Sequence, residues 1–323
     1  MIEKIDAVIT WVDGDDPRHK AKRQAFTSSE MVAEENVAGA TRFSSLGEIF
    51  YCVASINRFA PWINKIYIVT DEQNPQLEPF LEQHFPQGYI PVEIVDHKTI
   101  FRGYEEYLPT FNSISIESMT WRIPGLSDRF VEFNDDFVLT APVTIDDLFA
   151  PNGKVVCYAD KASFWWTSFT RLFKYRRDGS KAVSFKQTML NAASVLGCHG
   201  YYLKIDHTPR ALLRTLYEEY FTKNPAVLLR NISHRFRHAT QFNPQELQYL
   251  LLHQRGECEL RPVKGNLLYL KPKKGLEYIE KKLAKFSLDK ECKFGCFNSL
   301  DMACEEGRNK IVAWIKARIG LTD

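Results

Sequence analysis

The sequence of 323 residues lacks any apolar run of about 18 to 20 residues, the length that a membrane-spanning helix needs. It also lacks an excess of charge of one sign, because 42 Lys and Arg accompany 40 Asp and Glu and give a formal charge of +2. This balance argues against a nucleic-acid partner bound through global charge, so any anionic ligand must be met by local groups. The 45% hydrophobic content is typical of a globular protein with an ample core.

Cysteine is scarce, with seven residues, and odd in number. The one cluster, Cys292, Cys296 and Cys304, has no CxxC pair and no nearby His. These features predict buried thiols in a reducing compartment rather than a disulfide framework or a zinc site. Residues 1–6 show no basic region ahead of a long apolar stretch. We therefore expect a cytoplasmic protein, which can also associate with the inner face of the cell membrane.

The first 150 residues alternate between short β-rich runs and helical patterns. This alternation predicts an α/β fold with a mostly parallel sheet. Strands are expected at residues 5–12, 65–70, 92–95 and 129–133. Helices are expected at residues 46–60, at 76–84 and from about 112 onward.

The second half has a different pattern, which is mainly helical. Helices are expected at residues 183–196, 209–220, 244–253 and 301–319. Strands are expected there only at residues 259–263 and 267–270. The pattern predicts a helical elaboration on an α/β core.

Two acidic clusters follow predicted strands, at residues 13–16 and at Asp135-Asp136. Ligands of open parallel sheets bind beyond the carboxyl ends of the strands. Adjacent carboxylates repel one another, and a cation beside them favours their ionised form. A small set of oxygen ligands favours Mg²⁺ or Mn²⁺. The alternative is that Asp135 and Asp136 only cap the segment that follows them.

Two polar segments farther along the chain contain candidates for chemistry. His207 lies at the predicted start of a helix, and Arg237 lies in the dense polar run of residues 233–238. A His in such a place can carry a proton, and an Arg can hold a phosphate. Either residue can equally be an ordinary surface residue.

Two basic segments are also present. Residues 164–186 begin with Phe164-Trp165-Trp166 and carry six Lys and Arg against one acid. This mixture fits peripheral docking on an anionic membrane or stacking on an acceptor glycan, and it fits equally a partly buried helix with a solvated basic face. Residues 271–293 carry eight Lys against four acids, which is typical of a solvated helix face.

Residues 5–16, with the sequence Ile-Asp-Ala-Val-Ile-Thr-Trp-Val-Asp-Gly-Asp-Asp, resemble the opening block of the Stealth proteins. These are sugar-1-phosphate transferases of bacterial capsule synthesis, and their animal relatives include an N-acetylglucosamine-1-phosphotransferase. Later segments resemble further Stealth blocks in the same order. They are Arg42-Phe43, residues 60–75, residues 108–113, residues 122–127, residues 133–136, His207-x-Pro209 and residues 234–238.

The resemblance implies a Rossmann-like, glycosyltransferase-A-like fold and a defined reaction. Hexose-1-phosphate would move from a UDP-sugar to a hydroxyl of a glycan or lipid-linked glycan, with formation of a phosphodiester and release of UMP. In such a reaction positioning and cations carry most of the catalysis. The expected organisation is a nucleotide-sugar-binding core at residues 1–150, a basic and aromatic helical insertion at 151–200, and a C-terminal part at 201–323 that completes the site.

On this basis each candidate residue has an expected role. Asp135 and Asp136 would bind Mg²⁺ or Mn²⁺, with Asn134 orienting them or the donor sugar. His207 would be the general base, although an Asp could share that role, and Arg237 would hold phosphate oxygens. The nucleotide end would be shaped by Trp11, Val12, Asp13, Gly14 and Arg42. The further candidates are Asn112, Glu117 and Arg122, and a structural role is the alternative for the last two.

Two other functions fit parts of the sequence. A glycosyltransferase would use the same donor but cleave the bond at the anomeric carbon and release UDP. A non-catalytic scaffold would bind a glycan or a membrane through residues 164–186. The nucleotide that is released separates the first alternative from phosphotransfer, and loss of turnover in Asp136→Ala would exclude the second.

Overall fold

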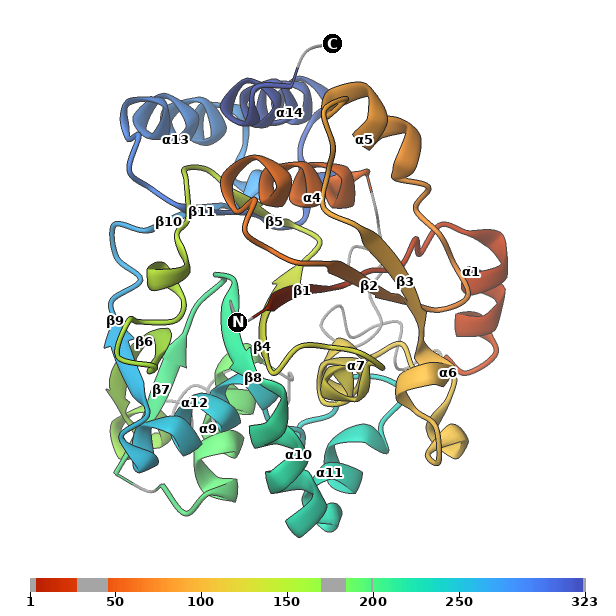
Figure 1. The fold of residues 1–323 in the computed structure, drawn as a ribbon, viewed down its shortest axis with the longest axis vertical. Helices are drawn as coiled ribbons and strands as arrows, with labels where there is room; N and C mark the ends of the chain where they lie inside the picture. Colours follow the sequence, from red (N-terminus) through yellow and green to blue (C-terminus); the bar gives the residue numbers. More distant parts are fainter. Residues whose placement is uncertain (1–3, 28–45, 170–183, 199, 322–323) are drawn as a thin grey trace.

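The computed structural model describes residues 4–27, 46–169, 184–198 and 200–321. Its main sheet has five strands in the order β3-β2-β1-β4-β8 (Figure 1). The strands are β1 (Ile5–Thr10), β2 (Ile66–Thr70), β3 (Val92–Asp96), β4 (Arg129–Asn134) and β8 (Arg210–Leu213). The first four run parallel and β8 runs antiparallel to β4. The predicted α/β class with a mostly parallel sheet is therefore confirmed.

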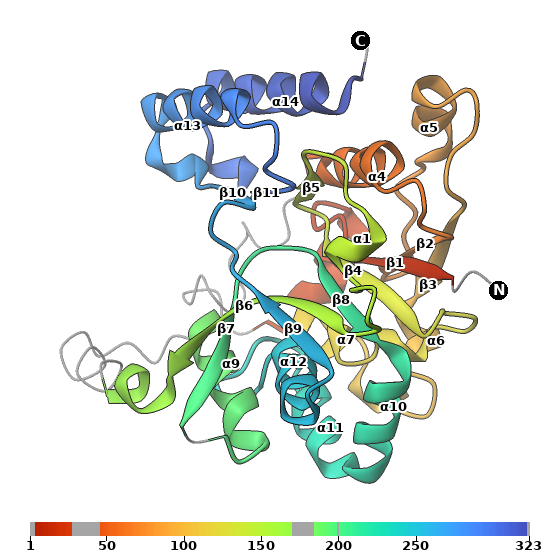
Figure 2. The ribbon, with the colours of Figure 1, turned by 60° about the vertical axis from the view of Figure 1, so that its left-hand side comes forward.

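Helices cover both faces of this sheet, as Figures 1 and 2 show. On one side lie α4 (Glu48–Phe59) and α5 (Glu78–His84), and α1 (Pro17–Gln24) follows β1. Helix α4 buries Ile49, Cys52, Val53 and Ile56, whose spacing of three and four residues places them on one face. On the other side lie α7 (Ser113–Glu117), α10 (Arg214–Lys223), α11 (Pro225–Ile232) and α12 (Pro244–Arg255). Strands β1 and β2 are almost completely buried, as strands covered on both faces must be.

Two small sheets extend the core. One has the order β10-β11-β5 and joins β10 (Leu267–Leu270) and β11 (Phe294–Phe297) to β5 (Phe137–Leu139), which directly follows β4. Helices α13 (Leu276–Leu288) and α14 (Glu305–Ile319) pack beside it (Figure 2). The other sheet has the order β7-β6-β9, with β6 (Val155–Ser163), β7 (Tyr201–Ile205) and β9 (Cys258–Arg261), and α9 (Phe185–Val195) packs on β7.

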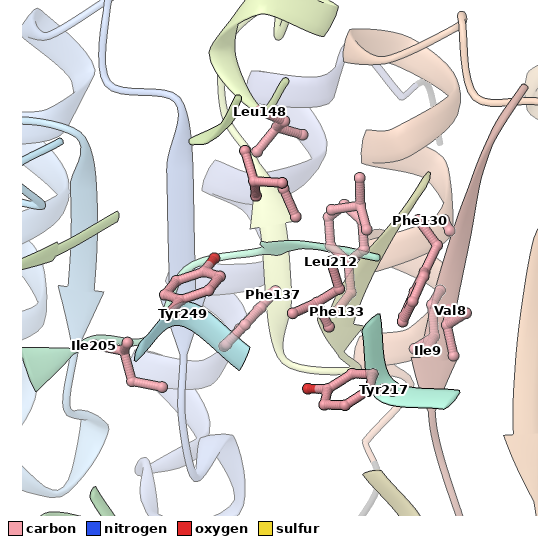
Figure 3. Close-up of a cluster of buried hydrophobic side chains, with 14 of the residues drawn as sticks. Val8, Ile9, Phe130, Phe133, Phe137, Leu148, Ile205, Leu212, Tyr217 and Tyr249 are labelled. Atoms are coloured by element: carbon pink, nitrogen blue, oxygen red, sulfur yellow. The ribbon is translucent and has the colours of Figure 1, made fainter. Parts of the chain in front are cut away.

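Short helices connect the larger elements. They are α6 (His97–Ile100), η2 (Glu105–Tyr107), η3 (Thr120–Arg122), η4 (Ile145–Asp147), η5 (Pro272–Lys274) and η6 (Leu300–Met302). One continuous hydrophobic cluster runs from the main sheet into the sheet of β6 and β7. Figure 3 shows part of it, from Val8 and Phe130 in the main sheet to Ile205 and Tyr249. The N-terminal core and the segments after residue 150 therefore share one interior.

The structure confirms the expected strands and helices of the first 150 residues, with ends that differ by a few residues. The expectation for the second half was wrong about strands. Strands β6, β7, β8 and β11 are present, and the described part of residues 151–200 contains β6 as well as α9, so it is not only helical. Residues 210–213 form a strand where a helix was expected, because a short buried apolar run has the same pattern in either structure.

Candidate active site

A cleft of about 450 Å³ opens at the carboxyl ends of β1 and β4. In this register Thr10 pairs with Asn134, so the residues that follow the two strands reach the same edge of the sheet. The cleft brings together the four residues for which catalytic roles are predicted. They are Asp135 and Asp136 after β4, His207 before β8 and Arg237 after α11.

The two Asp residues lie in the tight turn between β4 and β5. Asp136 is held from several sides, since its Oδ2 accepts from Nδ2 of Asn298 at 3.3 Å and its carbonyl accepts from the amide of Phe297 at 3.1 Å. Its other carboxylate oxygen, Oδ1, is buried without a hydrogen-bond partner. Burial raises the pKa of Asp135 well above its usual range, and the charges of Asp136 and Glu48 raise it further.

This arrangement fits a divalent cation. A buried carboxylate oxygen without a partner is costly, and a cation would satisfy it and remove the repulsion between the carboxylates. Among the described residues, no group of three or more His, Cys, Asp or Glu side chains is arranged to hold a metal ion. Mg²⁺ commonly needs only one or two carboxylates, because water and substrate phosphates complete its shell. Asp135 and Asp136 would hold the ion, with Glu48 near them.

His207 lies between two aromatic rings. Its ring is stacked on Tyr269 with centroids 4.8 Å apart, and on Phe185 with centroids 5.4 Å apart. The pKa of His207 is lowered by burial, which the charge of Asp136 partly opposes. A neutral ring held in this way is suited to accept a proton.

Two guanidinium groups line the cleft. Nη2 of Arg237 donates to Oγ of Ser113 at 2.9 Å, and its Nε is buried without a partner. Arg210 was missed by the sequence analysis. Its Nη1 donates to Oδ1 of Asn134 at 3.4 Å, its Nε is also buried without a partner, and the residue is 4% exposed. The signal that could have revealed it is a cation inside an apolar strand, directly after the His207-x-Pro209 motif.

A carboxylate pair lies behind the cleft. Nε2 of Gln245 donates to Oε2 of Glu117 at 2.9 Å and to Oε1 of Glu132. Burial raises the pKa of Glu132 to about 8, and the charge of Glu117 adds to this effect while that of Arg210 opposes it. Glu117 lines the cleft, whereas Glu132 and Gln245 do not. Neither of the latter was predicted, because only the fold brings their segments together.

Of the residues predicted to bind the nucleotide, some line the cleft and others support the loop behind it. Trp11 and Val12 line the cleft, whereas Asp13 and Gly14 do not. Asp13 shapes the loop, because its Oδ1 accepts from the amide of Asp15 at 2.9 Å. Gln73 fixes the same residue, since its side chain accepts from the Asp13 amide and donates to the Asp13 carbonyl. Arg42 lies outside the described residues.

Asn112 and Arg122 do not line the cleft. Asn112 is fully buried, and its Nδ2 donates to the carbonyls of His234 and Phe236 at 3.0 and 2.9 Å. It therefore supports the loop that carries Arg237. The guanidinium of Arg122 donates to two carbonyls, those of Ile100 and Arg102, both at 2.7 Å. The structure therefore shows structural contacts for both residues.

The basic and aromatic segment is described only in part. Trp165 and Trp166 are 66% and 69% exposed. The cations at residues 171–181 lie outside the described residues. The roles predicted for this segment therefore stay predictions. Each helix in the described part of the chain is too short or too polar to span a lipid bilayer.

Solved structures with a similar fold include glycosyltransferases. Mouse xyloside xylosyltransferase 1 has a TM-score of 0.41 and 10% identity, over 91% of this chain and 98% of that one. A bifunctional glycosyltransferase, WbbM, has a TM-score of 0.45 and 10% identity, over 100% of this chain and 52% of that one. The fold class of this chain follows from its mostly parallel main sheet with helices on both faces.

Curated relatives are more similar in sequence. An exopolysaccharide phosphotransferase of Streptomyces coelicolor is 35% identical over 249 residues, which are 74% of this chain and 41% of the relative. A capsular polysaccharide phosphotransferase of Streptococcus pneumoniae is 40% identical over 152 residues, which are 47% of this chain and 43% of the relative. A capsular polysaccharide phosphotransferase of Haemophilus influenzae is 30% identical, over 74% of this chain and 62% of the relative. The chain spans less than half the length of the first two.

Two family models match the chain in the order that the sequence motifs predicted. Residues 3–30 match Stealth protein conserved region 1, which contains β1 and the loop after it. Residues 42–157 match conserved region 2, which contains β2 to β5 and the Asp135-Asp136 turn. The N-terminal half of the chain therefore carries the first two conserved regions of the Stealth family.

Proposed function

We propose that the chain transfers hexose-1-phosphate from a UDP-sugar to a hydroxyl of a glycan or lipid-linked glycan, with release of UMP. The product would be a phosphodiester of a bacterial capsule or other cell-surface polysaccharide. The names of the relatives support phosphotransfer in polysaccharide synthesis. The main structural support is the single cleft in which two carboxylates, a neutral His and two Arg side chains meet.

In this reaction the acceptor oxygen attacks the β-phosphorus of the donor. His207 takes the proton of the hydroxyl, and the bond between the β-phosphorus and the bridging oxygen breaks, so that UMP leaves. Arg237 and Arg210 hold phosphate oxygens, because each guanidinium has an Nε that is buried and unpartnered. A Mg²⁺ ion bound by Asp135 and Asp136 would neutralise charge on the pyrophosphate.

The protein environment keeps these groups ready before substrate binds. The Tyr269 and Phe185 rings fix the plane of His207, and Ser113 and Asn112 fix the segment of Arg237. Trp11 and Val12 would contact the nucleotide at the end of β1. Such preorganised charges stabilise a transition state more effectively than mobile ones.

The released nucleotide provides the test. The purified protein is incubated with Mg²⁺, a panel of UDP-sugars and a glycan acceptor, and nucleotides are separated by chromatography. We expect UMP, and we expect excess EDTA to stop its formation. Release of UDP would identify the glycosyltransferase alternative instead, and undiminished activity in EDTA would contradict the metal assignment.

The scaffold alternative needs a separate variant. We expect Asp136→Ala to fold, as judged by circular dichroism, and to lose turnover. Asp128→Ala is a matched control, because Asp128 precedes β4, does not line the cleft, and its carboxylate accepts from the Thr215 amide at the start of α10. Retained function in Asp136→Ala would favour a non-catalytic role.

A further inference from the structure

A basic surface begins at the proposed general base. The Tyr269 ring, which stacks on His207, also lies 4.9 Å from Nζ of Lys271. Lys273, in η5, lines the cleft. The segment that appeared in the sequence as a solvated basic run therefore starts inside the active site.

The surface continues along one face of α13. Tyr278, Lys282 and Phe286 are four residues apart and share that face. Nζ of Lys274 lies 5.0 Å from the centre of the Tyr278 ring, and Nζ of Lys282 lies 5.9 Å from that ring and 5.6 Å from the Phe286 ring. At 1.5 Å per residue, the part of α13 from Leu276 to Lys285 extends about 14 Å. We call the cations of this surface the ridge lysines: Lys271, Lys273, Lys274, Lys282 and Lys285.

Across the described ranges, the ridge lysines have no acidic partners, although they lie next to one another around the cleft entrance and on α13. Lys65, Lys98 and Lys223 each form a salt bridge with a Glu. Within the part of the chain that the structure describes, no ridge lysine forms a salt bridge, and Glu280 of α13 pairs with Lys310 on α14 instead. Burial and the charges of neighbouring lysines lower the pKa of Lys282. These cations repel one another, and a polyanion would relieve the repulsion.

We propose that the ridge lysines bind a polyanionic, phosphodiester-containing glycan and direct its end toward His207. This inference rests on the proposed function, because each transfer would add one negative charge to the glycan. The partly buried rings of Tyr269, Tyr278 and Phe286 add apolar surface along the same path. A glycan is favoured over an anionic membrane because the ridge is continuous with the interior of the cleft, which a flat bilayer cannot enter.

The test uses the intact protein and long-chain inorganic polyphosphate as the probe, without donor. The triple variant Lys274→Gln, Lys282→Gln, Lys285→Gln removes three charges that do not line the cleft. The matched control is Lys4→Gln, Lys20→Gln, Lys204→Gln, which removes three exposed charges elsewhere. We expect the ridge variant to bind polyphosphate at least about tenfold more weakly, with a salt dependence reduced by roughly one unit of slope for each lost phosphate contact. The control should bind like the original protein.

Equal polyphosphate binding by the ridge variant and the control would overturn the proposal, as would absence of binding by the original protein. Binding to phosphatidylglycerol vesicles through the same lysines, without binding to polyphosphate, would overturn it in favour of a membrane. A catalytic arm separates the two proposals. The ridge variant should raise KM for a long anionic acceptor and leave kcat for a single-sugar acceptor unchanged. If neither the original protein nor either variant releases UMP, the proposed reaction is wrong. If the ridge variant nevertheless binds polyphosphate more weakly than the control, the ridge lysines still form a polyanion-binding site.

Discussion

The general-base role that we propose for His207 can be tested at the residue itself. The rings of Tyr269 and Phe185 fix the plane of its imidazole. Removal of the imidazole should therefore lower the reaction rate while the protein still folds. We expect His207→Ala to lower kcat by about 10² to 10⁴ with little change in donor KM. His84→Ala, on α5 and outside the cleft lining, is the control and should retain activity. A rate near that of the original protein would assign the base role to an Asp.

The same residue sets the direction of the pH dependence. A base must be unprotonated, and burial lowers the pKa of His207 from its ordinary value near 6.5. The rate at low pH should therefore begin to fall only below that ordinary value. A pH profile of kcat/KM measures this limb. A limb that survives unchanged in a His207 variant with residual activity would show that another group titrates.

The buried Glu132 should make the free energy of unfolding depend on pH. Its pKa is raised to about 8 by burial, whereas the unfolded chain has a value near 4.5. Between these values the unfolded chain ionises and the folded chain does not, so stability should fall as pH rises through this window, by up to roughly 1.4 kcal/mol per pH unit. We expect Glu132→Gln to match the original protein near pH 5 and to be more stable near pH 8. Urea unfolding at both pH values measures this.

The control for that experiment is Glu82→Gln, an exposed position on α5. Its stability should follow the original protein at both pH values. Parallel curves for Glu132→Gln and the original protein would mean that Glu132 is ionised in the folded state. Arg210, which lies opposite Glu132 in the β4–β8 register, would then stabilise the ionised carboxylate.

At the scale of elements, Asn112 connects the start of α7 to the loop that carries Arg237. It caps α7 by accepting from the Ile114 amide and donates to the carbonyls of His234 and Phe236. Asn112→Ala leaves buried carbonyls without a donor and should cost about 1 to 3 kcal/mol. Because Arg237 would lose its fixed position, kcat should fall as well. Urea unfolding and steady-state kinetics measure the two effects.

Asn57→Ala is the matched control for this prediction. Asn57 also joins two segments, since it donates to the Val53 carbonyl and accepts from the Ile90 amide, but it does not line or support the cleft. The control should lose stability and keep kcat. An Asn112→Ala variant that loses stability alone would show that the loop holds Arg237 without this side chain.

The elements differ in how much of them the sequence could predict. Strands β1, β2 and β4 are buried runs that end in turn residues, so their existence could be predicted, whereas their order in the sheet was not predicted. Strand β8 was missed, because its four residues continue directly into α10 and no turn residue separates them. The Asp135-Asp136 turn was found because it ends a predicted strand. Arg210, Glu132 and Gln245 were not, because their proximity depends on contacts between distant segments.

At the scale of the whole molecule, the cleft needs segments from both halves of the chain. Strand β5 follows the Asp135-Asp136 turn and pairs with β11, which places Asn298 next to Asp136. Helix α14 is tied back to α4, since Nε of Arg58 donates to the carbonyl of Ile319 at 2.9 Å. The C-terminal sheet and its helices therefore form one wall of the active site, and their packing should affect catalysis at a distance.

Gly307 offers a test of that wall. A Cβ at this position would lie 2.8 Å from Cδ1 of Ile279 and 3.3 Å from Sγ of Cys304, so a larger residue forces the Ile279 side chain of α13 to shift. We expect Gly307→Val to cost about 1 to 3 kcal/mol in urea unfolding through overpacking. Since α13 follows η5, which places Lys273 in the cleft, a displaced α13 should also raise KM for the acceptor. In Gly200→Ala the added Cβ meets open space, so neither the free energy of unfolding nor the acceptor KM should change. A Gly307→Val variant that is destabilised but keeps its acceptor KM would show that the packing of α13 and α14 does not affect acceptor binding.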